Sequence, residues 1–146
     1  GPNAVFLMDQ WDGYFAARQR ITSFLALRRP SNPIVITGDI HSSWVHDVKA
    51  NALNPASATV ATEFVGPSIS SDFPAILIPV TEAALPANPH TIFFDGLYHG
   101  YVRCTVTPEQ WIADYRVVPT ILDDQADAFT LRSFVVQDGE PGAILA

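Results

Sequence analysis

An aspartate and a histidine stand two residues apart directly after a short apolar run, and no other segment of the sequence carries so sharp a chemical signal. The run at residues 34–38 is rich in β-branched residues and leads into Asp39-Ile40-His41. Loop side chains that follow a buried strand often converge on a ligand, because the sheet holds them rigid. A carboxylate can bridge two cations and a neutral imidazole suits a transition metal, so Asp39 and His41 are candidate metal ligands. Taken alone, the Asp-x-His pattern fits an ordinary turn better than a metal site.

Two neighbouring side chains could assist such a site. Ser42 could hydrogen-bond the Asp39 carboxylate or a phosphate group, or it could cap a following helical turn. Glu63 is a carboxylate within an otherwise apolar segment. It could accept the second N–H of a metal-bound histidine, or it could pair with an arginine of the preceding helix.

The remaining reactive side chains favour structural roles. We expect Trp44 in the core, His46 at the surface and His90 in a turn-rich segment. Cys104 lies within a strand pattern, where a buried, inert thiol is common. The serines of residues 68–71 lack a Gly-x-Ser-x-Gly elbow, which argues against a serine hydrolase.

Composition indicates one globular domain. The chain has 146 residues, of which 48% are apolar and 16% charged, and this balance excludes disorder as the main state. The net charge of −7 argues against a nucleic-acid groove and against binding to an anionic membrane. We expect no transmembrane helix, because no run of about 18 apolar residues exists. We also expect no signal peptide, because no charged segment followed by an apolar one opens the chain. The single cysteine rules out an intrachain disulfide.

The elements that would position these residues begin with one long helix at residues 9–29. Six of its apolar side chains recur at helical spacing and are expected to form one buried face: Trp11, Tyr14, Phe15, Ile21, Phe24 and Leu25. Asp9 or Asp12 could cap its start, and Pro30 and Pro33 should end it. Gly1-Pro2 has the form of a protease-cleavage scar and is left out of the fold prediction.

Five or six strands are expected after the helix: 34–38, 59–65, 92–94, 101–106, 111–118 and 129–137. The run at 34–38 lacks alternation, as a central strand covered on both faces would, while residues 92–137 should form an antiparallel end. Gly38 is expected to allow the sharp turn after the first strand. Residues 72–91 contain four prolines and should be irregular, with short helical turns at most. The sequence therefore predicts an α+β domain. The strands at 34–38 and 59–65 are expected to pair with further strands, which need not lie within these 146 residues.

Five ordered segments resemble the alkaline phosphatase D (PhoD-like) family of metallophosphoesterases: residues 9–14 with the arginine-bearing helix, 32–44, 61–71, 88–101 and 111–116. The resemblance spans about residues 5–140, nearly the whole chain. It implies that the chain is part of a layered αββα metallophosphoesterase sandwich. The family's catalytic domain is much longer, so residues 3–146 would be its carboxyl-terminal portion, and the amino-terminal portion would be a partner.

The resemblance also implies chemistry. Asp39 and His41 match the family's Gly-Asp-x-His pattern, which implies that they hold metal in a binuclear centre of iron and calcium. Such a centre neutralises phosphate oxygens and lowers the pKa of bound water, and the implied activity is hydrolysis of phosphate mono- or diesters. His99 stands where the family more often has an arginine, so a phosphate contact from His99 would depart from the family pattern. Cys104 does not match the family's metal-binding cysteine. Export to the periplasm or the cell exterior is implied by the resemblance only.

Two other interpretations remain open at this stage. One is a non-catalytic, β-rich binding or scaffold module that retains the family framework, binds no metal and displays an exposed apolar patch. The other is an isolated adhesion-like sandwich, against which the long helix and the parallel-type strand count.

Overall fold

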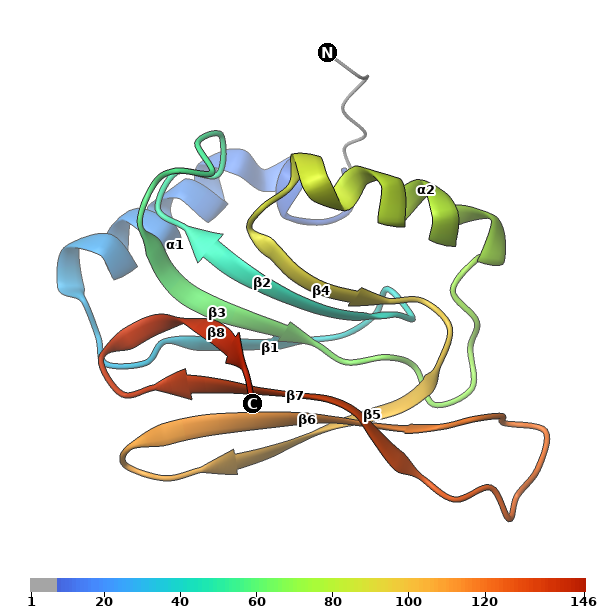
Figure 1. Cartoon of the computed structure of the whole chain (residues 1–146). Coiled ribbons are helices and arrows are strands. Elements are labelled where there is room, and N and C mark those ends of the chain that lie inside the picture. Colours follow the sequence, from blue (N-terminus) through green and yellow to red (C-terminus); the bar gives the residue numbers. More distant parts are fainter. Residues whose placement is uncertain (1–7) are drawn as a thin grey trace.

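The computed structural model describes residues 8–146, which form three layers (Figure 1). The possible scar at Gly1-Pro2 lies outside the described residues. The helical elements are η1 (Trp11–Tyr14), α1 (Phe15–Arg28), η2 (Ala75–Leu77), α2 (Ile78–Ala84) and η3 (Leu85–Ala87). The strands are β1 (Ile34–Thr37), β2 (Ser43–Lys49), β3 (Thr59–Val65), β4 (Thr91–Asp95), β5 (His99–Val106), β6 (Gln110–Val118), β7 (Phe129–Gln137) and β8 (Glu140–Leu145). The expected α+β class is confirmed, with eight strands in the described residues rather than five or six.

The first sheet has the strand order β1-β3-β2-β4. β1 runs parallel to β3, whereas β2 is antiparallel to both β3 and β4. The prediction of a central, doubly covered strand at 34–38 is wrong for the described residues, because β1 lies at the edge of this sheet and Ile36 is 61% exposed.

The second sheet is an antiparallel meander, β5-β6-β7-β8. The expected antiparallel end is therefore real, but it starts at His99. β4, which we expected in it, pairs with β2 in the first sheet instead.

The hydrophobic core lies between the two sheets. Its buried members are Val45, Phe64, Ala113, Tyr115, Phe134, Val136 and Ala143. The rings of Phe93, Tyr115 and Phe134 meet with centroids 5.4 to 6.0 Å apart. The Tyr115 hydroxyl donates to the carbonyl of Trp44, so a hydrogen bond also joins the sheets.

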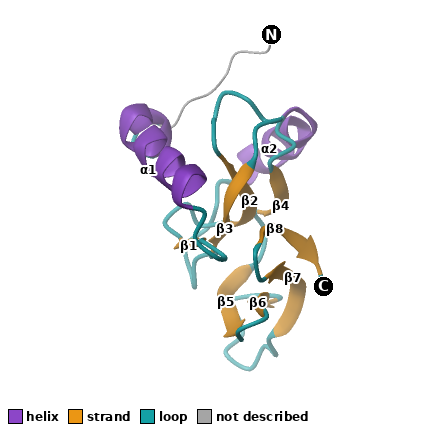
Figure 2. Ribbon diagram, turned by 90° about the vertical axis from the view of Figure 1, so that its left-hand side faces the viewer, coloured by secondary structure: helices purple, strands orange, loops and turns teal. Residues whose placement is uncertain are grey.

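Both helices lie on the face of the first sheet that points away from the second sheet (Figures 1 and 2). Polar groups join α1 to the loop that follows β2: Thr22 is buried, and both Thr22 Oγ1 and Gln19 Nε2 donate to the carbonyl of Ala50, over 3.1 Å each. The expected apolar face is not buried within the described residues: Phe24 is 56% exposed and Tyr14 61%.

The ends of α1 differ in part from expectation. No side chain caps its start, and Asp12 instead pairs with Arg18 at 2.9 Å. The helix stops before Pro30 as predicted, with Arg29 in the left-handed conformation and its N–H bonded to the carbonyl of Leu25.

Candidate functional site

The turn that carries Asp39 and His41 lies at the carboxyl end of β1, beside the loop that follows β3. Because β1 and β3 are parallel, their carboxyl ends meet at one edge of the sheet. The N–H of Gly66 donates to the carbonyl of Thr37 over 2.9 Å, which ties the two strand ends together. The sheet therefore holds the 38–42 turn and the 66–74 loop side by side.

Two non-glycine residues of this turn have left-handed backbone conformations. Asp39 has φ of 77° and His41 has φ of 60°, whereas Gly38, from which we expected the sharp turn, has no positive φ. Each such residue costs roughly 1–2 kcal/mol, and such conformations persist where the surrounding structure fixes them. Both side chains are exposed. The backbone thus presents a carboxylate and an imidazole to the outside at an energetic cost.

The imidazole of His41 is oriented by one contact. Its Nδ1 lies 3.3 Å from the carbonyl oxygen of Asp72, in the 66–74 loop. A carbonyl only accepts, so this hydrogen bond places the proton of the neutral ring on Nδ1. The lone pair of Nε2 is then free to bind a cation.

Ser42 is buried and bonded within the turn. Its hydroxyl accepts from Trp44 Nε1 over 2.8 Å and donates to the carbonyl of Ile40 over 3.3 Å. A strand rather than a helical turn follows, so the capping interpretation is wrong. Ser42 braces the turn that carries the two candidate ligands.

Glu63 lies in β3, next to Phe64, and points to the opposite face from that core residue. It accepts a hydrogen bond from Thr37 Oγ1 over 3.1 Å, and no ion pair with an arginine of the helix forms among the described residues. Burial raises the pKa of Glu63, although the bond from Thr37 opposes this. The carboxyl group of Glu63 therefore lies beside Thr37, the last residue of β1.

His99 also joins the 66–74 loop. Its Nε2 lies 3.2 Å from Oδ1 of Asp72, and its side chain is 14% exposed, compared with 84% for Asp72. The structure thus brings His41 and His99 to the same residue. Asp72 was not a candidate in the sequence, because an aspartate in a proline-rich loop carries no distinctive pattern.

His46 is not the surface histidine that we expected. It is half-buried on the helix-facing side of β2, stacks on Trp44 with centroids 5.4 Å apart, and lies across from Glu63 in the strand register. Its Nδ1 lies 3.2 Å from Thr91 Oγ1. Burial, with a smaller contribution from nearby His90, lowers the pKa of His46 to about 4.

This lowered pKa predicts loss of stability in mild acid. The unfolded chain takes up a proton at His46 below pH 6.5 and the folded chain only near pH 4, so the free energy of unfolding should fall by roughly 3 kcal/mol across that window. The raised pKa of Glu63 acts in the opposite direction as the pH rises above 4.5. The test measures the free energy of unfolding of wild type and of His46→Asn by urea unfolding at pH 7.5 and at pH 5. Both proteins contain Glu63, so its contribution cancels when their pH dependences are compared. An equal pH dependence in the two proteins would contradict the prediction.

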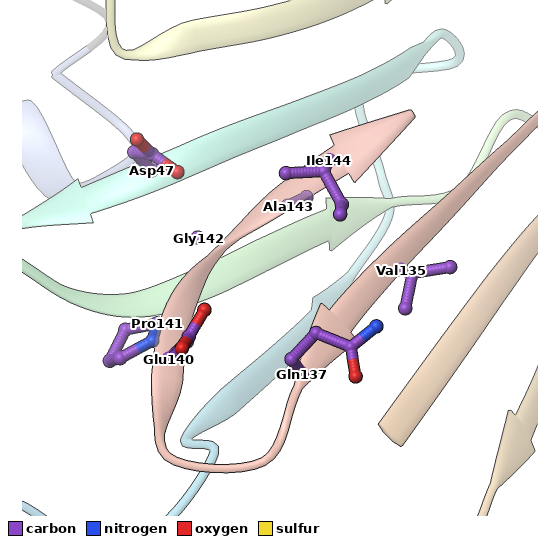
Figure 3. A pocket seen from close by; sticks show the side chains of 8 residues that line it. All are labelled: Asp47, Val135, Gln137, Glu140, Pro141, Gly142, Ala143 and Ile144. Carbon is purple, nitrogen blue, oxygen red and sulfur yellow. The ribbon is translucent and has the colours of Figure 1, made fainter. Parts of the chain in front are cut away.

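Two pockets of the described chain lie near β7 and β8 and near Trp111, and neither contains the candidate ligands. One, of about 280 Å³, lies between β2 and the β7–β8 hairpin, with Asp47 on one side and Glu140 on the other (Figure 3). The other, of about 410 Å³, lies near Trp111 and Asp138. Across residues 8–146, no three His, Cys, Asp or Glu side chains gather closely enough to hold a metal ion. Asp39 and His41 are therefore exposed and lie outside both pockets.

Comparison with known proteins places this arrangement in a family. The family model described as PhoD-like phosphatase matches residues 2–115. The chain belongs to the PhoD-like phosphatase family. It is 42% identical over 139 residues to alkaline phosphatase D of Bacillus subtilis (strain 168), covering 94% of this chain and 24% of that protein. A solved structure, "Structure of PhoD", superimposes with a TM-score of 0.83 at 39% identity, covering 94% of this chain and 26% of the other.

The chain thus spans about a quarter of the length of these PhoD-like relatives. The donors present fit part of a metal site: a carboxylate suits either a hard or a transition cation, and an imidazole with a free Nε2 suits a transition metal. Two donors do not complete the shell of four or more ligands that such ions take in proteins. Cys104 lies in β5 and joins no cluster of metal-ligating side chains among the described residues, and burial raises the pKa of its thiol. None of the described helices is long and apolar enough to cross a membrane.

Proposed function

We propose that this chain supplies part of the binuclear metal site of a metal-dependent phosphoric ester hydrolase. The observation that carries the proposal is the exposed turn after β1, where Asp39 and His41 both adopt left-handed backbone conformations. Strain of this kind concentrates at functional sites. The named relative, alkaline phosphatase D, supports a phosphatase activity, and the proposal covers both phosphate monoesters and diesters.

In this proposal Asp39 and His41 each contribute one ligand. The Asp39 carboxylate makes no hydrogen bond with the described residues, so its oxygens are available. The Nδ1–H bond to Asp72 leaves the lone pair of the exposed His41 ring on Nε2. When bound, iron and calcium would neutralise phosphate oxygens and lower the pKa of bound water. In this proposal Ser42 does not touch substrate. Its hydroxyl stabilises the turn through hydrogen bonds with the Ile40 carbonyl and Trp44 Nε1.

The rest of the site would come from the amino-terminal portion of the same domain, this chain being the carboxyl-terminal portion. Two features support that partner. β1 has only β3 as a neighbour among the described strands, and α1 leaves Tyr14 and Phe24 exposed. A second helical layer beyond the β5–β8 sheet would complete an αββα sandwich. Export from the cytoplasm belongs to the same proposal and rests on the family alone.

A non-catalytic binding module would also show exposed apolar side chains, so Phe24 does not separate the two functions. Metal content does. In the full-length protein that contains this chain, His41→Ala should lose at least one equivalent of bound metal, measured by elemental analysis after gel filtration. The matched variant His90→Ala, on a half-buried histidine away from the turn, should keep the wild-type metal content. Full metal retention in His41→Ala, or a wild-type protein without metal, would overturn the proposal.

A further inference from the structure

We propose that Asp72 and His99 are positioning residues, which hold the imidazole of His41 in the orientation and tautomer that cation binding requires. This inference rests on the proposed function, because it assigns a role to His41 as a ligand. His99 and Asp72 touch neither substrate nor metal in this proposal. They act on His41 through the 66–74 loop.

The 66–74 loop is bound to both sheets. At its start, Gly66 donates to the carbonyl of Thr37 in the first sheet. Further along, the N–H of Gly100, in β5 of the second sheet, donates to the carbonyl of Ser68 over 3.0 Å. The Ser68 hydroxyl donates to the carbonyl of Ser71, which closes a tight turn just before Asp72. The loop is therefore tied to both sheets ahead of Asp72, the residue that meets His41.

His99 fixes the Asp72 side chain. A carboxylate only accepts, so the 3.2 Å contact places a proton on Nε2 of His99. With 84% of its side chain exposed, Asp72 has little else to restrain it. His99 itself is well anchored, because it pairs with Val118 in the β5–β6 ladder and is mostly buried.

The start of β5 packs tightly against β6. A Cβ added at Gly100 would lie 2.0 Å from the carbonyl oxygen of Arg116, so the two strands are in close backbone contact here. His99 therefore contacts Asp72 from a strand that is paired along its length with β6.

Asp72 in turn contacts His41 through its backbone carbonyl. A metal-bound histidine usually donates its other ring N–H to a carbonyl or a carboxylate, which fixes its tautomer and raises its basicity. The carbonyl of Asp72, 3.3 Å from Nδ1, is that acceptor here. Removing the side-chain anchor leaves the carbonyl in the chain but frees it to move away from His41.

The first experiment titrates Co²⁺ into the metal-depleted full-length protein and follows visible absorption. His99→Ala and Asp72→Ala should raise the dissociation constant 10- to 100-fold, the range typical of partners behind a ligand. His99→Gln should recover most of the affinity, because its amide N–H can reach the same oxygen, and His90→Ala should bind as wild type does. Wild-type affinity in His99→Ala, or no rescue by glutamine in a folded variant, would overturn the proposal.

The second experiment detects the tautomer directly, with ¹⁵N-labelled histidine in the metal-depleted protein. The His41 signal, identified by its loss in His41→Ala, should show the proton on Nδ1 in wild type and a mixture of tautomers in His99→Ala. An Nε2–H ring in wild type would overturn the proposal. If His41→Ala abolishes Co²⁺ binding while His99→Ala does not, only the positioning role fails. If neither changes it, the proposed function fails as well.

Discussion

On the proposed function, replacing Asp39 with alanine is expected to lower kcat/KM for phosphate ester hydrolysis by the full-length protein by more than about 100-fold. Loss of a residue behind a ligand costs about 10- to 100-fold in activity, so loss of a ligand itself should exceed that range. The measurement uses a chromogenic phosphate monoester and a diester at saturating metal. Asp123→Ala, in the loop before β7, is the matched control and should stay near wild type. Retention of more than about a tenth of the activity by Asp39→Ala would contradict the assignment.

A companion variant separates activity from stability at the same position. Asp39 has φ of 77°, where alanine is strained and glycine is not. Asp39→Gly should be as inactive as Asp39→Ala, yet its free energy of unfolding should be about 1 kcal/mol higher than that of Asp39→Ala. Urea unfolding of the two variants measures the difference. Equal stabilities would mean that the backbone of this turn relaxes when the carboxylate is removed.

The position of this turn could be predicted from the sequence, whereas its conformation could not. An apolar β-branched run followed by polar residues predicts a strand end, and Asp39 and His41 follow it. Glycine is the usual residue at positive φ, so Gly38 was the natural choice for the sharp turn. The structure instead places Asp39 and His41 there. Surrounding contacts impose such conformations, and sequence pattern does not record them.

Two strands were missed for identifiable reasons. β2 has Val45 on its core face and Trp44 with His46 on the other, so apolar and aromatic residues occupy both faces and hide the alternation. β8 contains Pro141 and Gly142, which usually mark a turn. Pro141 is tolerated because β8 is an edge strand, where a missing N–H costs no ladder bond. The N–H of Gly142 finds its partner in Thr62 Oγ1, at 3.0 Å.

The helix shows a different limit. Periodicity predicted one helix at residues 9–29 with an apolar face, and the structure has the 3₁₀ helix η1 at Trp11–Tyr14 followed by α1 at Phe15–Arg28. Burial of that face depends on what lies against it, and this chain spans only about a quarter of its relatives. The sequence thus predicted that Phe24 lies in a helix, but it did not predict that the Phe24 side chain is exposed in this chain.

Phe64→Ala is expected to lower the free energy of unfolding of this 146-residue chain by about 3–5 kcal/mol. Phe64 is fully buried in β3, at the centre of the core between the two sheets, and nearby rings cannot fill the cavity that its loss leaves. Urea unfolding followed by tryptophan fluorescence measures the change. A loss under about 1 kcal/mol would contradict the observed core.

Phe24→Ala is the matched control, since it removes the same ring from an exposed site. Phe24 is 56% exposed, so its loss should cost less than about 1 kcal/mol in this chain. The comparison gains a second use in the full-length protein. If the amino-terminal portion covers α1, the cost of Phe24→Ala should rise towards that of Phe64→Ala, whereas the cost of Phe64→Ala should stay the same. An unchanged, small cost for Phe24→Ala in the full-length protein would show that the apolar face of α1 stays uncovered there too.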